Sequence, residues 1–365
     1  MENYNERYAR HYSLKNFGID AQQKLEKAKV LVIGAGGLGC PVLQYLAAAG
    51  VGTIGIADND ILSLSNLQRQ VLYTTNDIGK PKTEVAEERL KRLNPGVEIA
   101  IHQTNISTAN ALEILQIYDV VVDCTDNFTA RYIINDACVL LGKPLVFGAI
   151  YQYEGQVAVF NVLDDKGIRT NYRHLFPEPP APGEAPDCNE AGVLGVLPGV
   201  IGIMQATEVI KLVTGIGEVL VNKILNFSLL SYVSVQFGID GNAVDNAGPK
   251  TEAEFRNIDY EVLCGVTSRN IVALEASVFK EWAAYPDTIV IDVRERNEQP
   301  KSKFAQINIP LAELENYEPG LTEENILLFC QSGKRSLKAA ELLASRFGSS
   351  KNIAHLKGGI ISLQE

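Results

Sequence analysis

The sequence has no Cys-x-x-Cys pair. Its six cysteines are scattered along 365 residues without the spacing of a disulfide framework: Cys40, Cys124, Cys138, Cys188, Cys264 and Cys330. Cysteines that are neither paired nor clustered are typical of proteins kept in a reducing compartment. We therefore expect a cytoplasmic protein.

The chain also lacks an excess of positive charge and a long apolar run. Its net charge of -11 and pI near 5.0 argue against nucleic acid or an acidic membrane surface as the main partner. The N-terminal stretch "MENYNERYARHYSLKNFG" has no apolar core of a signal peptide. The longest uncharged run, 191–207, is broken by Pro198 and falls short of a membrane span, so we expect a buried loop and helix there.

What the sequence does contain is an alternation of predicted strands and helices. Apolar segments predict strands at 29–34, 53–58, 97–102 and 119–125, separated by helices at 41–49, 82–93 and 108–117. Strand, helix and parallel strand in succession predict an α/β fold with a Rossmann-like, mostly parallel sheet and helices on both faces. Antiparallel strands such as "GQVAVF" and a helix at 201–213 are expected to complete this domain.

The length of the chain is enough for a second domain. A chain of 365 residues exceeds the size at which one hydrophobic core usually keeps growing. We expect the first domain to cover 1–240, a small, polar, turn-rich linker to cover 241–265, and a small α/β domain to cover 266–365.

A glycine-rich turn, "GAGGLGC" (34–40), follows the first predicted strand and precedes the first helix. Gly34, Gly36 and Gly39 have the spacing of a nucleotide-binding loop, and Gly37 lies among them. Such a loop lets the backbone approach a phosphate, which binds the free N–H groups of the helix. Alone it is compatible with NAD, FAD or ATP. Asp58 ends the second strand, where an acidic side chain commonly holds ribose; a turn or helix cap is the alternative.

Polar side chains at the same predicted sheet edge separate these candidates. "DNDILSLSNLQRQ" (58–70) supplies Asn66 and Arg69, and Lys82 begins the next helix. Cations that converge on one crevice suit polyphosphate better than nicotinamide, although each alone would be an ordinary surface cation. Asp126 follows the fourth buried strand, so it is a candidate Mg²⁺ ligand or the cap of the next helix.

Together "GAGGLGC", "SNLQRQ", "IGKPK" and "DCTDN" resemble the MoeB/ThiF family of adenylyltransferases, relatives of ubiquitin-activating enzymes, over roughly residues 1–245. The resemblance implies that ATP and Mg²⁺ bind and that the chain forms a homodimer. It also implies that the substrate is the C-terminal glycine of a ubiquitin-like sulfur carrier ending in Gly-Gly, which becomes an acyl-adenylate. The implied roles are ribose binding by Asp58, phosphate binding by Asn66, Arg69 and Lys82, metal binding by Asp126, and a contribution to the partner's site by Arg10.

Two cysteine features bear on this resemblance. Cys188 stands where the family has its conserved cysteine, which implies an acyl acceptor or a mixed disulfide; a spectator thiol is the alternative. The family often carries two Cys-x-x-Cys pairs that hold zinc. Here "NYRH" (171–174) replaces the first pair and only Cys264 lies near the second, so we predict no zinc.

A third cysteine begins the loop "CQSGKRS", directly after the apolar strand "ILLF" and before a helix. Backbone N–H groups of this turn, the helix N-terminus, Lys334 and Arg335 favour a negative sulfur, so we predict a lowered pKa for the Cys330 thiol. With "IDVRE", "INIPL" and "LKGGI", the region resembles rhodanese, in which a loop of this length suits a persulfide. Asp292 and Arg294 are interpreted as structural.

The two regions together predict an adenylyltransferase fused to a sulfurtransferase. The first would adenylate the carrier, and a Cys330 persulfide, charged by a donor such as a cysteine desulfurase, would deliver sulfur to give a thiocarboxylate. Cys188 would resolve the acyl disulfide. Proteins of this kind serve molybdopterin, thiamin or tRNA-thiolation carriers. Two alternatives stay open: a nucleotide-dependent oxidoreductase with a fused rhodanese, and a non-catalytic docking scaffold.

Overall fold

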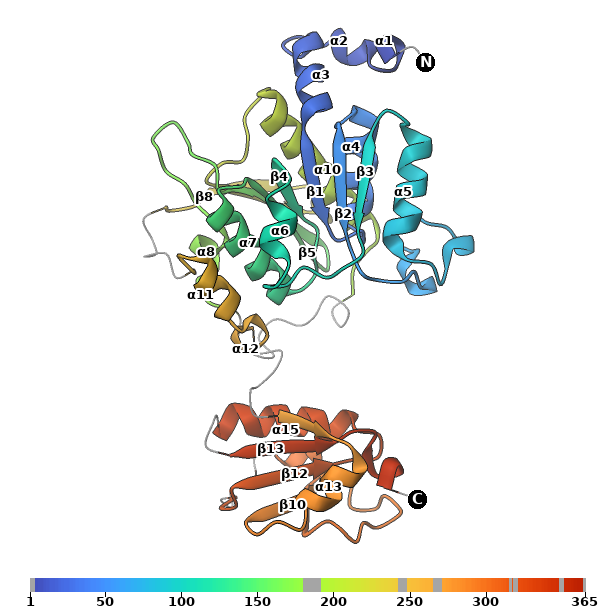
Figure 1. Ribbon diagram of the computed structural model, residues 1–365, viewed down its shortest axis with the longest axis vertical. Helices are drawn as coiled ribbons and strands as arrows, with labels where there is room; N and C mark the ends of the chain where they lie inside the picture. Colours follow the sequence, from blue (N-terminus) through green and yellow to red (C-terminus); the bar gives the residue numbers. More distant parts are fainter. Residues whose placement is uncertain are drawn as a thin grey trace. The chain divides into compact units, whose positions relative to one another are not determined.

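The computed structural model describes residues 4–179, 192–241, 248–264, 271–314, 317, 321–347 and 351–363. The chain divides into two compact units, Met1–Tyr260 and Glu261–Glu365 (Figure 1). The range expected as a linker differs from this division, because helix α11 (Glu252–Asn257) belongs to the first unit and contacts helix α7 (Phe128–Leu141). Residues 248–260 are thus part of the first unit.

The first unit is built on an eight-stranded sheet in the order β3-β2-β1-β4-β5-β6-β7-β8. Its first five strands in this order are parallel, and the last three pair antiparallel. The predicted Rossmann-like fold class is confirmed. The strands are β1 (Lys29–Ile33), β2 (Thr53–Ala57), β3 (Glu98–His102), β4 (Val120–Asp123), β5 (Leu145–Tyr151), β6 (Glu154–Phe160), β7 (Lys223–Ser228) and β8 (Ser234–Gly238).

Helices cover both faces of this sheet (Figure 1). Helix α4 packs on β1 and β2 and against α10, whereas α6 and α7 pack against each other on the opposite face. This arrangement follows from right-handed crossovers, because the chain runs outward from β1 to β3 and then returns past β1 to β4. The helices of this unit also include α1 (Tyr4–Arg7), α2 (Ala9–Tyr12), α3 (Gly18–Lys27), α4 (Gly39–Ala49), α5 (Lys82–Leu93), α6 (Ala111–Leu115), α8 (Tyr172–Leu175) and α10 (Val196–Thr214). The short helix α12 (Tyr260–Leu263) spans the boundary between the two units.

Helix α10 is long and apolar enough to cross a membrane by length and composition alone. It nevertheless contacts α4, β5 and β6, and Leu197, Ile201 and Val209 on it are buried. These contacts make α10 a core helix of the first unit, and it begins earlier than the predicted 201–213.

The second unit has a five-stranded sheet in the order β11-β10-β12-β13-β9, in which every pairing is parallel. Strand β12 is buried on both faces, because alternate side chains enter two separate apolar clusters. This explains its unbroken apolar sequence. The elements are β9 (Ile271–Leu274), α13 (Ala276–Trp282), β10 (Thr288–Asp292), β11 (Ile307–Asn308), α14 (Leu311–Leu314), β12 (Asn325–Phe329), α15 (Lys334–Phe347) and β13 (Asn352–Leu356).

Candidate active sites

The order of the first sheet reverses at β1, which has β2 on one side and β4 on the other. In open α/β sheets, ligands bind outside the carboxyl ends of the strands at such a switch point. The glycine loop after β1 lies there in contact with the end of β4: a Cβ on Gly34 would be 2.7 Å from the carbonyl oxygen of Cys124. Gly34 also has a φ of 95°, which only glycine adopts readily.

The other loop glycines have different roles. A Cβ on Gly39 would be 1.9 Å from the carbonyl oxygen of Gly34, so this glycine lets α4 start directly against the loop. A Cβ on Gly36 would be 3.6 Å from its nearest neighbour, an ordinary contact distance. Gly39 is therefore required by packing, whereas the fold leaves space at Gly36.

Asp58, at the end of β2, is tied to this loop. Its Oδ2 accepts a hydrogen bond from the Ala35 N–H at 2.7 Å, and its Oδ1 accepts one from the Asp60 N–H at 2.7 Å. The alternative role as a turn cap is therefore real. Each carboxylate oxygen has a second lone pair. Asp58 can thus hold the glycine loop in place and still accept from a ribose hydroxyl.

Lys82, the first residue of α5, is buried, and its Nζ lies 2.6 Å from Oδ2 of Asp60. The lysine side chain is 5% exposed, whereas that of Asp60 is 69% exposed. The backbones are joined as well, because the Lys82 N–H donates to the Asp60 carbonyl at 3.0 Å. Asp60 was not among the sequence candidates. Its spacing in "DND" was the available signal, since it sits two residues beyond Asp58.

Asn66 and Arg69 lie on the segment that follows β2. The Oδ1 of Asn66 accepts from the Ser63 N–H at 3.0 Å, which fixes the turn. Arg69 donates from Nη1 to the Ser65 carbonyl at 3.1 Å, and its Cδ lies 3.5 Å from the position of a Cβ on Gly37. The structure therefore places the stem of Arg69 beside the glycine loop.

Asp126 follows β4 and is exposed. The cap of α7 is not Asp126 but Asn127, whose Oδ1 accepts from the Ala130 N–H at 2.8 Å. The alternative role of Asp126 as a helix cap is therefore wrong. Asp123, the last residue of β4, is buried, and burial raises the pKa of its carboxyl. The nearby charge of Asp126 acts in the same direction. Asp123 accepts from the backbone and the hydroxyl of Thr125, so it shapes the turn that presents Asp126.

Two further candidates lie elsewhere. Arg10 is an exposed residue of α2, a short helix that contacts α1 and α3. Cys188 lies outside the described residues. Both assignments stay predictions.

The segment 171–174, where the family has its first cysteine pair, is held by a buried ion pair. Arg173 donates from Nε and Nη2 to the two carboxylate oxygens of Asp136 at 2.8 and 2.7 Å. The hydroxyl of Tyr260 donates to the same carboxylate at 2.7 Å, and all three side chains are buried. Within the described residues, no group of three or more metal-ligating side chains is found. The side chains present here do not fit a thiolate zinc site.

In the second unit, Cys330 is buried directly after β12, at the start of the short loop that leads to α15. Burial alone would raise the pKa of its thiol. The Ser336 hydroxyl and the N–H groups of Ser336, Ser332 and Gly333 outweigh this effect, and the pKa is lowered. The predicted direction is confirmed. Ser336, which was not a sequence candidate, is the side chain that contributes most to it.

The active loop, which runs from Cys330 to Gly333, packs against the backbone of the segment "LKGGI" (356–360). The N–H of Ile360 donates to the Cys330 carbonyl at 2.7 Å. A Cβ on Gly359 would be 2.5 Å from the backbone of Gln331, and one on Gly333 would be 3.1 Å from the Gly358 nitrogen. Glycines at these positions let two backbone turns lie in contact, which fixes the loop that surrounds the sulfur.

Arg335 lies in the first turn of α15, directly after the active loop, and is paired with Glu298. Its Nη1 is 2.5 Å from Oε1 and its Nη2 is 2.9 Å from Oε2. Arg335 also interacts electrostatically with the cysteine, because the negative charge of an ionised Cys330 contributes to the raised pKa of the Arg335 guanidinium. Its charge is thus shared between the thiol and Glu298. No local pattern indicated this contact, which spans 37 residues.

Asp292 and Arg294 form a second ion pair next to the loop. Arg294 is 1% exposed and donates from Nη2 to Asp292 at 2.7 Å and to the Pro300 carbonyl at 3.0 Å. Its Nη1 also contacts the Gln331 side chain at 3.4 Å. These contacts agree with the structural role expected from the sequence.

Comparison with known proteins agrees with the geometry of the first unit. The ThiF family model matches residues 8–239. The chain belongs to the ThiF family. Over 369 residues it is 39% identical to "Probable adenylyltransferase/sulfurtransferase MoeZ" of Mycobacterium tuberculosis, covering 98% of this chain and 92% of that protein. It is 48% identical over 262 residues to "Sulfur carrier protein adenylyltransferase" of Thermus thermophilus, covering 72% of this chain and 97% of the relative.

Solved structures are similar as well. The crystal structure titled "E. coli MccB + ATP" matches with a TM-score of 0.56 and 25% sequence identity, covering 65% of this chain and 72% of that one. The match confirms the fold of the part of this ThiF-family chain that it covers. The relative from Mycobacterium tuberculosis extends the similarity through the second unit, since it spans nearly the whole chain.

Proposed function

We propose that the chain adenylates the C-terminal glycine of a ubiquitin-like sulfur carrier and then transfers sulfur to it from Cys330. The observation that carries the proposal is that one chain combines two sites: a glycine loop with Arg69 beside it and the charge of Lys82 acting on its Cys40, and a cysteine whose pKa is lowered. Relatives named for both activities, one of them aligned along nearly the whole chain, support the same conclusion.

In the first reaction a carboxylate oxygen of the carrier attacks the α-phosphorus of ATP, and pyrophosphate leaves. Arg69 and Lys82 would bind the phosphate oxygens, where negative charge accumulates. Asp58 would bind the ribose. Asp126 would hold Mg²⁺, which neutralises charge on the separating pyrophosphate. The exposed carboxylate of Asp126, with the helix cap supplied by its neighbour, fits this role.

In the second reaction the terminal sulfur of a Cys330 persulfide attacks the acyl carbon, and AMP leaves. In a persulfide the reacting sulfur lies one S–S bond, about 2 Å, beyond Sγ. A buried thiol can therefore present an accessible terminal sulfur. Attack by the Cys188 thiolate on Sγ of Cys330 would release the thiocarboxylate and leave a disulfide, which a cellular thiol reductant returns to two thiols.

The persulfide is supplied by a donor protein such as a cysteine desulfurase, and the enzyme works in the cytoplasm as a homodimer. In the homodimer, Arg10 reaches the partner's nucleotide site. Its position on an exposed face of α2 supports this role. An oxidoreductase is disfavoured by the relatives, which are named transferases.

The test is carrier-dependent exchange between ATP and labelled pyrophosphate. Asp126→Asn should abolish exchange, and Asp165→Asn, at another exposed aspartate, should leave it unchanged. For the second reaction, Cys330→Ala should abolish thiocarboxylate formation and retain exchange, with Cys264→Ala as the control. Failure of every Gly-Gly carrier to elicit exchange would overturn the proposal.

A further inference from the structure

Arg335, one of two cations in the first turn of α15, is paired with a residue outside the active loop. Glu298 follows β10 and holds both terminal nitrogens of Arg335, at 2.5 and 2.9 Å. The Glu298 carboxylate also accepts from the Glu295 N–H at 2.9 Å, which fixes its orientation. Hydrogen bonding to Arg335 lowers the pKa of Glu298 to about 2, so this carboxylate is charged at neutral pH.

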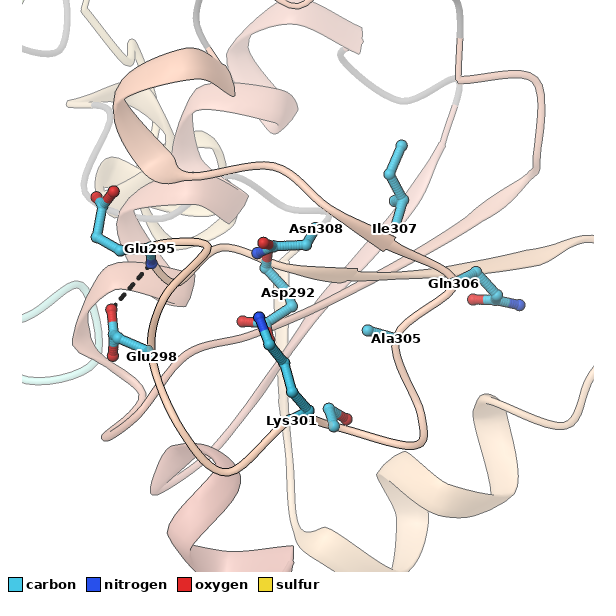
Figure 2. Close-up of a pocket in the computed structure, with 9 residues that line it drawn as sticks. Asp292, Glu295, Glu298, Lys301, Ala305, Gln306, Ile307 and Asn308 are labelled. Carbon is cyan, nitrogen blue, oxygen red and sulfur yellow. Dashed lines mark hydrogen bonds between the residues drawn. The ribbon is translucent and has the colours of Figure 1, made fainter.

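The pocket beside this ion pair is rich in carboxylates (Figure 2). Its lining includes Asp292, Glu295 and Glu298, against a single cation, Lys301. Asp292 is paired with Arg294 and Glu298 with Arg335, so the remaining charges of the lining are those of Glu295 and Lys301, which have opposite signs. Lys334, the first residue of α15, is the other cation beside Cys330. The pairing of Arg335 with Glu298 therefore reduces, without removing, the positive charge that is offered to a small anion.

We propose that Glu298 is a specificity-determining residue, which neutralises Arg335 and thereby disfavours small dianionic sulfur donors, such as thiosulfate, at Cys330. The inference rests on the proposed function, because it concerns the donor that charges the same cysteine. A donor that presents its sulfur as a protein persulfide carries less charge at the reacting atom. Such a donor does not need a free cation in the loop.

The disfavoured step is defined chemically. The Cys330 thiolate attacks the outer sulfur of thiosulfate, the S–S bond of thiosulfate breaks, and sulfite leaves with the bonding electrons. Cyanide then takes the outer sulfur from the persulfide, which gives thiocyanate and restores the thiolate. Attack of an anion on a dianion requires local positive charge, which Arg335 supplies only when Glu298 does not cancel it.

The experiment measures thiosulfate-to-cyanide sulfur transfer by the full-length chain. Glu298→Gln keeps the shape and one acceptor oxygen but removes the charge. We expect the KM for thiosulfate to fall about five- to tenfold, with kcat changed by less than about twofold, and the gain to shrink at high salt. Glu295→Gln is the matched control, because it removes a charge from the same pocket that acts on Arg335 more weakly than Glu298 does, and it should change KM by less than about twofold.

The opposite perturbation keeps the test decisive if Glu298→Gln folds poorly. Arg335→Gln leaves the Glu298 charge unopposed, and the KM for thiosulfate should rise. An unchanged or higher KM in a folded Glu298→Gln protein, or an equal fall in Glu295→Gln, would overturn the inference. Cys330→Ala distinguishes failure of the proposed function from failure of this inference. If the variant transfers sulfur as well as the wild type does, the proposed function is wrong.

Discussion

Removing the Ser336 hydroxyl should raise the pKa of Cys330 and slow sulfur chemistry at neutral pH. Burial of Cys330 opposes ionisation, and the hydroxyl of Ser336 is the largest contribution that offsets it. A hydrogen bond to a charged group contributes about 1.5–3 kcal/mol. Ser336→Ala should therefore raise the pKa of Cys330, and the loss of about 1.5–3 kcal/mol from the thiolate corresponds to an ionisation constant that is smaller by about ten- to a hundredfold.

Replacing Ser336 by alanine should disturb the folded loop little. Ser336 is buried, and its hydroxyl lies 3.1 Å from the Gly333 carbonyl, so its single proton is donated either to this carbonyl or to the Cys330 thiolate. The substitution removes one oxygen without adding volume. The backbone N–H groups of Ser332, Gly333 and Ser336 remain in place. The loop should therefore keep its shape while the thiolate loses one donor.

The assay is ultraviolet thiolate absorbance against pH, taken as the difference between each protein and its own Cys330→Ala partner. This subtraction removes the signals of the other cysteines, of which Cys40, Cys124 and Cys138 have pKa values raised by burial. A titration midpoint that does not move, or that moves down, would refute the idea that the side chain of Ser336 stabilises the thiolate. Ser332→Ala, at an exposed loop serine, is the matched control and should leave the midpoint unchanged.

Three further predictions concern other parts of the chain. Gly36→Ala should change the free energy of unfolding by less than about 0.5 kcal/mol but raise the KM for ATP at least about tenfold. Gly39→Ala should lower the free energy of unfolding by about 1–3 kcal/mol, because its Cβ would collide with the backbone. Thermal unfolding and exchange kinetics distinguish the two effects. At a pH above the ordinary pKa of a glutamate, the ion pair of Glu298 should stabilise the chain by about 1–2 kcal/mol, a figure already reduced for solvent screening. This stabilisation should disappear as the pH falls towards about 2. The melting temperatures of wild type and Glu298→Gln should therefore converge in acid. Arg173→Met should lower the unfolding free energy by about 3–5 kcal/mol, because Asp136 is left buried without its partner, whereas a chelator should leave wild-type melting unchanged; about one zinc per chain by metal analysis would contradict the prediction of no zinc.

Much of the fold follows from local sequence. The runs at β1, β2 and β4 are apolar because these strands are buried on both faces, and a strand buried in this way has a short, unbroken apolar sequence. The glycine spacing at 34–39 and the loop that begins at Cys330 are also local, because a turn between a strand and a helix is built from consecutive residues. These features located both candidate sites and the direction of the pKa shift at Cys330.

The partners of the charged side chains depended on tertiary structure. Asp60 meets Lys82 across 22 residues, Glu298 meets Arg335 across 37, and Asp136 collects Arg173 and Tyr260 from two distant segments. From the sequence alone these residues look like ordinary surface charges, because the two members of an ion pair have no characteristic spacing. Whether such a pair stabilises or destabilises the fold depends on how deeply it is buried. Local sequence therefore determined where the backbone turns and where the sulfur and the phosphate loop lie. Only the packing of distant strands and helices decided which charges remain free to act on a substrate, since a charge is cancelled by whatever the fold places beside it.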